Sequence, residues 1–195
     1  MPNKLPESES GISNVEMPET NPEHLPLMHR NIASTVIFSS DGKVLLGRKD
    51  SKGGGVYSDS WHLPGGGVEP RGGFDDAASE SLIEAAAREL GEEVVGLDAD
   101  QNVLEALPGL RGSGATTKIF KDGTKAWCEM DFNYFRLASK LTSEELAGIL
   151  EPGSDFVELR FFAPEELSEL DTMPGGIEEQ IINGNLTPTS STSDN

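Results

Sequence analysis

Cysteine is almost absent from this chain, since Cys128 is the single cysteine among 195 residues. One cysteine cannot form an intramolecular disulfide, and the N-terminus shows neither the basic nor the apolar region of a secretory signal. No apolar stretch approaches the roughly 18 residues that suggest a membrane span. We therefore expect a soluble protein of the reducing cytoplasm with no membrane partner.

Basic residues are also scarce: 15 lysines and arginines stand against 34 acidic residues, for a formal net charge of -19. A field of this sign repels duplex nucleic acid, and the sequence shows no local basic patch. Divalent cations held by carboxylates would still invert the local sign and admit a polyanion. The composition therefore argues against duplex nucleic acid as a partner and permits a small nucleotide or another organic diphosphate. It leaves a homodimer open.

The length and the 35% hydrophobic content suit one globular domain. Residues 1–28 are rich in Pro, Glu, Ser and Asn, and are predicted to be a flexible acidic tail. Residues 187–195 form a Thr/Ser/Pro run with the same prediction. The domain is therefore expected to occupy residues 29–186.

Short segments of high β-propensity predict a set of strands. Residues 32–39 and 43–48 are joined by Asp41-Gly42, a strong hairpin signal, and are expected to pair. Further strands are predicted at 61–63, 102–107, 116–120, 125–137 and 155–162, and helices at 79–95, 164–170 and 177–182. One core-facing side of segment 125–137 is predicted from alternation: Ala126, Cys128, Met130, Phe132 and Tyr134. Thr142 and Glu145 have the spacing of a capping box. The mixed order of elements predicts an α+β fold.

The predicted helix 79–95 carries an unusual acidic face. An apolar stripe of Ile83, Ala87, Leu90 and Val94 is expected to face the core. Glu89, Glu92 and Glu93 share another face at i, i+3, i+4 spacing, where the carboxylates repel one another unless a cation lies between them. A hard divalent cation with oxygen ligands suits such a face.

Each of these features has an ordinary structural explanation when it stands alone. An acidic helical face is usually solvated surface, and Glu84 with Arg88 is a common i, i+4 pair. The run Gly65-Gly66-Gly67 by itself predicts only a turn.

Taken together, the two features resemble the sequence box of the Nudix family. In that box, a glutamate is followed by seven residues and then by Arg-Glu-aliphatic-any-Glu-Glu. Here Glu80 precedes seven residues and then Arg88-Glu89-Leu90-Gly91-Glu92-Glu93. Upstream, Leu63-Pro64-Gly65-Gly66-Gly67-Val68-Glu69 is similar to the family's Pro-Gly-Gly-any-aliphatic-Glu segment.

The chain departs from the family pattern at two places. The connection between Glu69 and Glu80 is about eight residues too long, and the extra segment is assigned to Arg71–Ala78. The family's final glycine would fall on Val95, whereas the chain has Gly96, so altered geometry is expected at the end of the helix. Neither departure touches the acidic residues of the box.

The resemblance implies a fold, a metal and a reaction. The implied fold is an α/β/α sandwich with a mixed β-sheet between helices, and the implied reaction is Mg2+- or Mn2+-dependent cleavage of a diphosphate bond in a nucleoside diphosphate derivative or nucleoside triphosphate. The implied metal ligands are Glu89, Glu92, Glu93 and the carbonyl of Gly66. Arg88 would orient these carboxylates, and Glu80 would support the metal or its water. The general base is left open among Glu93, Glu129, Asp131 and Glu158.

The expected substrate contacts are Arg48, Trp61, Gly65, Gly66 and Trp127, although aromatic residues in strands more often serve packing. One alternative function is a non-catalytic nucleotide-binding or regulatory module, which would normally have lost the carboxylates. The other is an enzyme like isopentenyl diphosphate isomerase. That reaction needs convergence of Cys128 with the histidines, which are His24, His29 and His62.

Overall fold

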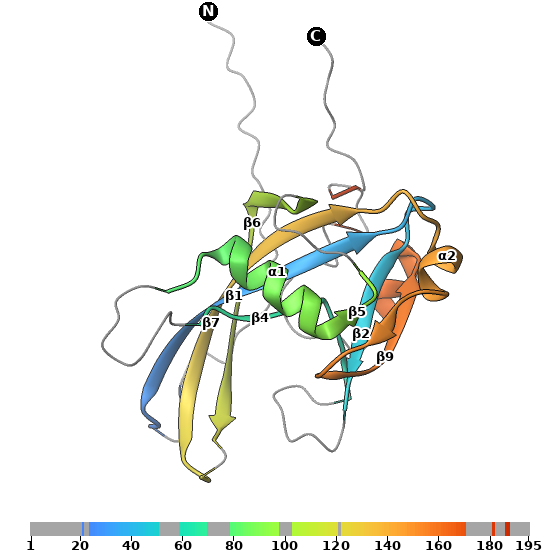
Figure 1. The fold of residues 1–195 in the computed structure, drawn as a ribbon. Coiled ribbons are helices and arrows are strands. Elements are labelled where there is room, and N and C mark those ends of the chain that lie inside the picture. The colour runs from blue at the N-terminus through green and yellow to red at the C-terminus, as the bar shows by residue number, and fades with distance from the viewer. Residues whose placement is uncertain are drawn as a thin grey trace, which may run out of the picture.

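The computed structural model describes residues 21, 24–50, 59–69, 79–97, 103–120, 122–170, 181 and 186–187. Within them, a curled seven-stranded sheet carries helix α1 on one face (Figure 1). Its strands are β1 (Leu27–Phe38), β2 (Val44–Lys49), β3 (Trp61–His62), β4 (Gly65–Gly67), β6 (Glu105–Ile119), β7 (Lys125–Ala138) and β9 (Phe156–Phe162). The remaining elements are α1 (Leu82–Glu93), β5 (Val94–Val95), α2 (Ser143–Ala147), β8 (Glu151–Pro152) and the 3-10 helix η2 (Pro164–Glu169).

Strand β1 lies at the centre of the sheet, whose main path runs β3-β2-β1-β7-β6. It pairs in parallel with β7 along its whole length, from Leu27 opposite Trp127 to Phe38 opposite Ala138. The remaining pairings are antiparallel, so the sheet is mixed, as predicted. The predicted hairpin of β1 and β2 forms, but its strands pair only at Phe38 and Val44 before they diverge. Beyond that point β4 takes the edge of β1, and β9 takes the edge of β2.

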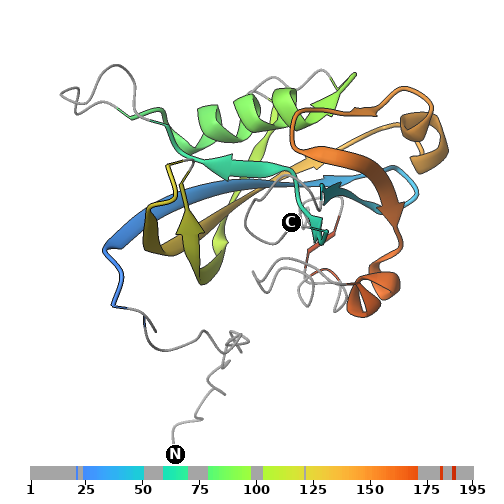
Figure 2. The same ribbon diagram turned by 90° about the horizontal axis from the view of Figure 1, so that it is seen from below.

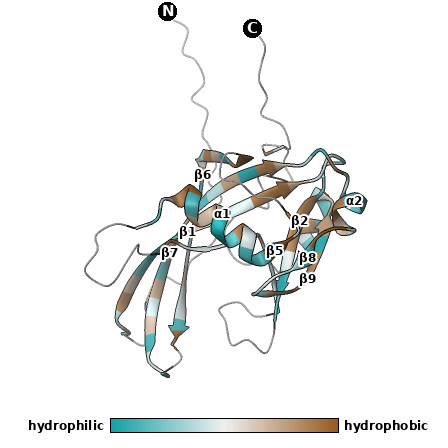
Figure 3. Cartoon of the chain, viewed as in Figure 1, coloured by the Kyte–Doolittle hydropathy of each residue, from teal (hydrophilic) through white to brown (hydrophobic). Residues whose placement is uncertain are grey.

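Two apolar cores lie on opposite faces of this sheet. On one face, Ala33, Ile37 and Phe135 pack with Ala86 and Leu90 of α1. On the other face, the core of β1 and β7 packs with Leu167 of η2, and Figure 2 shows α1 and η2 on opposite sides of the strands. In Figure 3 the strand segments beside α1 are largely brown, whereas the far ends of β1, β7 and β6 mix brown with teal. The protein therefore has the α+β architecture expected from its sequence.

Strands β6 and β7 differ from their predictions. The predicted side of β7 is buried except for half-buried Met130, but Phe135 and Leu137 of the opposite side are buried too, because a central strand is covered on both faces. Segments 102–107 and 116–120 were predicted as separate strands, yet β6 runs unbroken through both from Glu105. Its pairing with β7 shifts register between Ala106 and Arg111. The glycines between the two predicted segments, Gly109, Gly112 and Gly114, lack the side chains that would reveal a strand.

Helix α1 begins with a complete capping box. The Ser81 hydroxyl accepts from the Glu84 N–H, and the Glu84 carboxylate accepts from the Ser81 N–H at 2.8 Å. The helix ends at Glu93, the chain pairs as β5 with β8, and Gly96 then turns with φ +90°. The displaced glycine therefore serves a turn that follows a short strand.

The buried face of α1 is rotated from the predicted one. Ala85, Ala86, Leu90, Glu93 and the following Val94 are buried, whereas Ile83 and Ala87 are only partly buried at the margin of the core. The prediction was therefore wrong in part. Alanines let the helix approach β1 and the glycines of β4 closely, so this side of the helix faces the sheet.

The remaining predictions concern the ends and the C-terminal helices. The capping box at Thr142 and the helix predicted at 164–170, seen as η2, are present. β1 begins at Leu27, inside the predicted tail, and Thr187 accepts a 2.9 Å hydrogen bond from Arg136. Residues 1–20, 71–78, 188–195 and all of the predicted helix 177–182 except Ile181 lie outside the described residues. No described helix is long and apolar enough to cross a membrane.

Candidate active site

The glycine strand β4 brings the acidic helix against the edge of the sheet. Gly66 pairs with Ala33 of β1, and its missing side chain leaves the space that the Glu89 carboxylate occupies. A Cβ at Gly66 would overlap both carboxylate oxygens. Burial is the main cause that raises the pKa of Glu89 above its ordinary value. The glycine run, predicted as a turn, is therefore a strand whose lack of side chains makes room for an acid.

Glu93 is the most deeply placed acid of the site. It is 1% exposed, and its Oε2 accepts a 2.7 Å hydrogen bond from the Gly65 N–H. Burial raises the pKa of Glu93 to about 8, although the Gly65 hydrogen bond acts in the opposite direction. A buried carboxylate with so little compensation is a strong proton acceptor and a strong attractor of cations.

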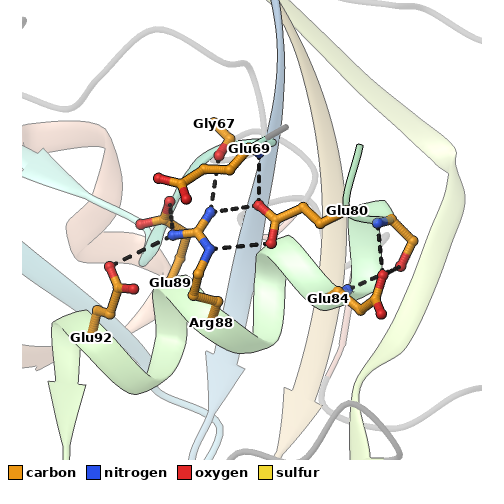
Figure 4. Close-up of polar contacts among 8 residues, drawn as sticks. Gly67, Glu69, Glu80, Glu84, Arg88, Glu89 and Glu92 are labelled. Carbon is orange, nitrogen blue, oxygen red and sulfur yellow. Dashed lines mark hydrogen bonds and ion pairs between the residues drawn. The ribbon is translucent and has the colours of Figure 1, made fainter. Parts of the chain in front are cut away.

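Arg88 holds the acids of the box in place (Figure 4). Its guanidinium donates two hydrogen bonds to Glu80, at 3.2 and 2.7 Å, one to Glu89 at 2.8 Å and one to the Gly67 carbonyl at 3.0 Å. Glu92 approaches the same group at 3.6 Å but is half-exposed. The hydrogen bonds to Arg88 are the main cause that lowers the pKa of Glu80 and keeps it ionised. Arg88 therefore fixes Glu89 and Glu80 against the glycine strand.

Glu69 and Glu80 flank, in the chain, the extra segment that the family pattern lacks, and they are hydrogen-bonded to each other. The Glu80 N–H donates to the Glu69 carbonyl at 3.0 Å, and the Glu69 N–H donates to the Glu80 carboxylate at 2.8 Å. These two bonds join the end of the β4 segment to the start of the helix. Glu80 thus reaches Arg88 as the family box implies, even though Arg71–Ala78 intervenes.

Asp155 and Lys49 belong to the electrostatic surroundings of the acids but were not predicted. The Gly153 and Ser154 N–H groups donate to the carbonyls of Glu93 and Glu92, at 2.9 and 3.0 Å, and so fix this loop to the end of α1. Asp155 follows and raises the pKa values of Glu89 and Glu93 further, whereas Lys49, which pairs with Asp155 at 3.5 Å, lowers that of Glu93. The only sequence signal was the Pro-Gly-Ser turn before Asp155.

The predicted substrate contacts do not all lie together. Arg48 and Trp61 are cross-strand neighbours on β2 and β3, whereas Gly65 and Gly66 lie on β4, which follows β3 in the chain and pairs with β1. Arg48 is already paired with Asp59 at 2.9 Å and with Glu158 at 3.1 Å. Trp127 is buried and is aligned with Leu27 of β1. Leu27 lies six residues before Ala33, the partner of Gly66, and six strand residues span roughly 20 Å. Trp127 is therefore separated from the acidic site.

The alternative bases and the isomerase residues are also dispersed. Glu129 pairs with His29 at 3.3 Å near the far end of β7, and Glu158 pairs with Arg48. Asp131 is exposed and is aligned with Asn31 of β1. Asn31 lies two residues before Ala33, the β1 residue that pairs with Gly66. For the isomerase, Cys128 lies on the sheet face opposite to His29, while His62 contacts Ser60 at 2.8 Å on the distant β3. The thiol and these histidines do not converge.

The donor set fits a hard divalent cation. Glu89 and Glu93 could supply carboxylate oxygens and Gly66 a carbonyl, and the Glu89 carboxylate fits beside Gly66 because no Cβ fills that space. Across the described ranges, no three His, Cys, Asp or Glu side chains are gathered closely enough to form a ready metal cage. Glu92 is the outlying member of the predicted ligands, because its side chain points toward Arg88 and solvent. It would have to turn inward to join the other two.

Comparison with known proteins places this geometry in a family. The NUDIX domain model matches residues 28–181. No curated protein sequence matches the chain. Among solved structures, the chain is similar to a Caenorhabditis elegans Ap4A hydrolase at 14% identity and a TM-score of 0.50, over 80% of this chain and 95% of that one.

Two further similar structures are the NUDIX domain of Shewanella oneidensis NrtR complexed with ADP ribose and the Nudix hydrolase RenU of Mycobacterium smegmatis. The first has 14% identity and a TM-score of 0.49 over 87% of this chain and 95% of that one. The second has 19% identity and a TM-score of 0.47 over 81% and 85%. The family model covers most of the chain, including the glycine strand and the carboxylate helix. This protein therefore belongs to the Nudix family.

Proposed function

We propose that this protein is a divalent-cation-dependent hydrolase that cleaves a diphosphate bond in a nucleoside diphosphate derivative or a nucleoside triphosphate. The observation that carries the proposal is the seating of Glu89 and Glu93 against the glycine strand, with Arg88 and Glu80 bracing the helix. A non-catalytic relative would have no need to keep buried carboxylates that repel each other.

Glu89, Glu93 and the Gly66 carbonyl would hold Mg2+ or Mn2+, and Glu92 would complete the set from the exposed side. The cation, when bound, neutralises charge on the phosphate oxygens and acidifies a water molecule. Arg88 and Glu80 would keep Glu89 oriented, since a ligand that is held in place loses less entropy on binding. The negative field of the rest of the chain would then be reversed locally.

Glu93 is the proposed proton acceptor. Glu129 and Glu158 are each paired with a basic residue on another element, and Asp131 lies on an exposed strand position. Glu93 is instead buried within the site, and the Gly65 N–H fixes its direction. Asp155 would strengthen the local negative field, because its charge raises the pKa of Glu93 further.

Arg48 and Trp61 are proposed as a wall for the non-reacting part of the substrate, because Trp61 lies four residues before Gly65 in the chain and Arg48 is its cross-strand neighbour. Trp127 is not retained in this role, since it is buried far along β1 and β7. We also propose a cytoplasmic location, in which the buried Cys128 stays a thiol, while light scattering would decide whether a homodimer forms.

The direct test is a substrate screen with Mg2+ or Mn2+ over nucleoside triphosphates, nucleotide sugars, ADP-ribose, dinucleoside polyphosphates and inositol polyphosphates, with products identified by mass. Cleavage between two phosphorus atoms is expected for at least one compound. Turnover should require the cation and should stop in EDTA. Binding of these compounds without turnover at any divalent cation concentration would favour the non-catalytic alternative instead.

A further inference from the structure

Two half-buried cations lie outside the acidic site, on β1 and β6. Arg30 and Lys118 have no carboxylate partner among the described residues. The other described cations that lack one, Arg111, Lys140 and Arg160, are exposed and can be hydrated fully. The chain contains 34 acidic residues, yet none of those that the structure describes forms an ion pair with Arg30 or Lys118. Lys118 is compensated only in part, by the ring of Phe120 at 5.4 Å from its Nζ. Half-buried charges without counterions are unfavourable, and a ligand of opposite charge would stabilise them.

The strand register places both cations on the same face of the sheet. Arg30 is aligned with Met130 and, through it, with Gly114, whereas Lys118 is aligned with Ala126. Side chains alternate along a strand, so Arg30 and Lys118 share the face opposite to α1. In Figure 1 these ends of β1, β7 and β6 extend beyond the helix.

The region between the two cations contains small side chains apart from Met130, which is aligned with Arg30. Cys128 lies between them in the register, and Thr116 and Gly114 are its neighbours on β6. Both cations lower the pKa of the buried Cys128 thiol, although burial, the larger cause, raises it overall. Arg30 and Lys118 therefore act on the same small area of the sheet.

Arg30 is also next to the proposed active site. Its guanidinium occupies the space that a Cβ at Gly67 would need, while the Glu89 carboxylate occupies that space at Gly66. Neighbouring residues of a strand are about 3.3 Å apart and face opposite sides. Within the described residues, β4 pairs only with β1, so its other edge carries no strand. An extended anion that bends around this edge would pass from the acidic site to Arg30.

The charges of Arg30 and Lys118 also act on each other. Burial lowers the pKa of Lys118, and the charge of Arg30 lowers it further. An anion between the two groups would remove this repulsion and gain charge-assisted hydrogen bonds.

From this geometry we propose that Arg30 and Lys118 bind a phosphate of the substrate that lies beyond the scissile diphosphate. The site therefore selects compounds with three or more phosphates over compounds with two, such as nucleotide sugars. This inference rests on the proposed function, because it names the substrate class of the same site. Arg30 supplies a planar donor set near the diphosphate, and Lys118 supplies a second charge farther along the sheet.

The test compares the wild-type protein with Arg30→Met and Lys118→Met, which keep an unbranched stem and remove the charge. Lys140→Met is the matched control, since Lys140 is an exposed lysine away from both sites. Calorimetry without divalent cations measures the binding of inorganic triphosphate and pyrophosphate. Steady-state kinetics with Mg2+ then compare a nucleoside triphosphate with a nucleotide sugar.

Wild-type protein should bind triphosphate more tightly than pyrophosphate. Arg30→Met and Lys118→Met should each weaken triphosphate binding about tenfold or more. They should raise KM for the nucleoside triphosphate by a similar factor and raise KM for the nucleotide sugar much less, because the nucleotide sugar has no third phosphate. Without ligand at low salt, their Tm should match or exceed that of the wild type, because a like-charge repulsion is gone.

Two failures are distinguishable. If diphosphates are hydrolysed but both variants bind triphosphate and turn over all substrates like Lys140→Met, the cationic pair is not a phosphate site. If no diphosphate is hydrolysed, yet triphosphate binding still depends on Arg30 and Lys118, the proposed function fails while phosphate binding by the pair stands. A large fall in the Tm of both unliganded variants would assign the pair a structural role and overturn the inference.

Discussion

At the scale of single residues, the site depends on side chains that are missing. Gly66 leaves the space for Glu89, and Gly65 offers an unobstructed N–H to Glu93. The two acids are consequently removed from water, and burial raises both pKa values. Such carboxylates are stabilised best by a cation, so the glycines determine the chemistry as much as the acids do.

A methyl group at Gly66 should lower the activity strongly while changing the thermal stability little. Gly66→Ala would overlap the end of the Glu89 side chain and displace it from one of the hydrogen bonds of Arg88, so Tm should change by only about 2–4 °C. Activity should fall about a hundredfold, because a displaced ligand weakens cation binding. The measurement is kcat/KM against Mg2+ concentration together with thermal unfolding.

Gly91→Ala is the control for this change. Gly91 is an exposed glycine in α1 with no atom near the position of a new Cβ. Alanine there should stabilise the helix by roughly 0.5–1 kcal/mol and leave kcat/KM unchanged. Wild-type kinetics in Gly66→Ala would mean that Glu89 need not lie where it does.

At the scale of elements, the carboxyl end of α1 is fixed by the loop before β9. The Gly153 and Ser154 N–H groups satisfy the Glu93 and Glu92 carbonyls, and the next residue is Asp155. Gly153 is packed against the backbone of Glu92, so this contact cannot be relieved by a side-chain rotation. The loop therefore sets both the end of the helix and the field around Glu93.

Gly153→Ala should accordingly disturb stability and activity together. The new Cβ would overlap the Glu92 carbonyl and displace the loop, at a cost of about 2 kcal/mol, or several degrees in Tm. Gly148→Ala is the control, because Gly148 has helical dihedral angles and its Cβ would make only ordinary contacts. Equal Tm values for the two variants would show that the loop does not hold the helix.

The segment Arg71–Ala78 should affect substrate selection and not the chemical step. The hydrogen bonds between Glu69 and Glu80 already join the glycine strand to the start of α1, so deletion of the segment should leave the Arg88 hydrogen bonds intact. The deletion variant should still bind Mg2+ and hydrolyse at least one diphosphate, with the order of substrates changed through KM. Calorimetric loss of Mg2+ binding would show that the alignment of the two blocks is wrong.

The sequence predicted most elements because their signals are local. The Asp41-Gly42 turn, the Thr142 capping box and the spacing from Glu80 to Glu93 each lie within one short, continuous stretch of the chain. The strand nature of Gly65–Gly67 and the length of β6 were missed, because glycine-rich strands have no side-chain alternation. Asp155 and Lys49 were missed because only tertiary hydrogen bonds bring them to the helix.

At the scale of the whole molecule, the net charge of -19 adds to the unfavourable field at a site that already contains the buried Glu93 and the half-buried Glu89. Without a divalent cation, folding keeps Glu93 protonated over a range in which the unfolded chain has released that proton. The native state then binds more protons than the unfolded state, so stability must fall as pH rises.

The pH dependence can be predicted from the pKa of Glu93, which is raised from 4.5 to about 8. In EDTA, the free energy of unfolding should decrease between pH 5 and 8 by at most about 1.4 kcal/mol per pH unit. Glu93→Gln should flatten the decrease, and saturating Mg2+ should offset it by stabilising the ionised form. Chemical denaturation at several pH values measures this. A stability that rises through the same range in EDTA would contradict the burial of Glu93.

The most direct test of the central claim is the Mg2+-dependent hydrolysis rate of the best diphosphate substrate in wild-type, Glu93→Gln and Glu144→Gln proteins. Glu144 is an exposed glutamate of α2 away from the site, so its variant controls for the loss of one negative charge. Glu93→Gln should fold and lose several orders of magnitude in kcat, because both cation binding and proton acceptance are impaired, while Glu144→Gln should match the wild type. Near-wild-type turnover by folded Glu93→Gln would show that the buried acid of α1 is not the centre of the reaction.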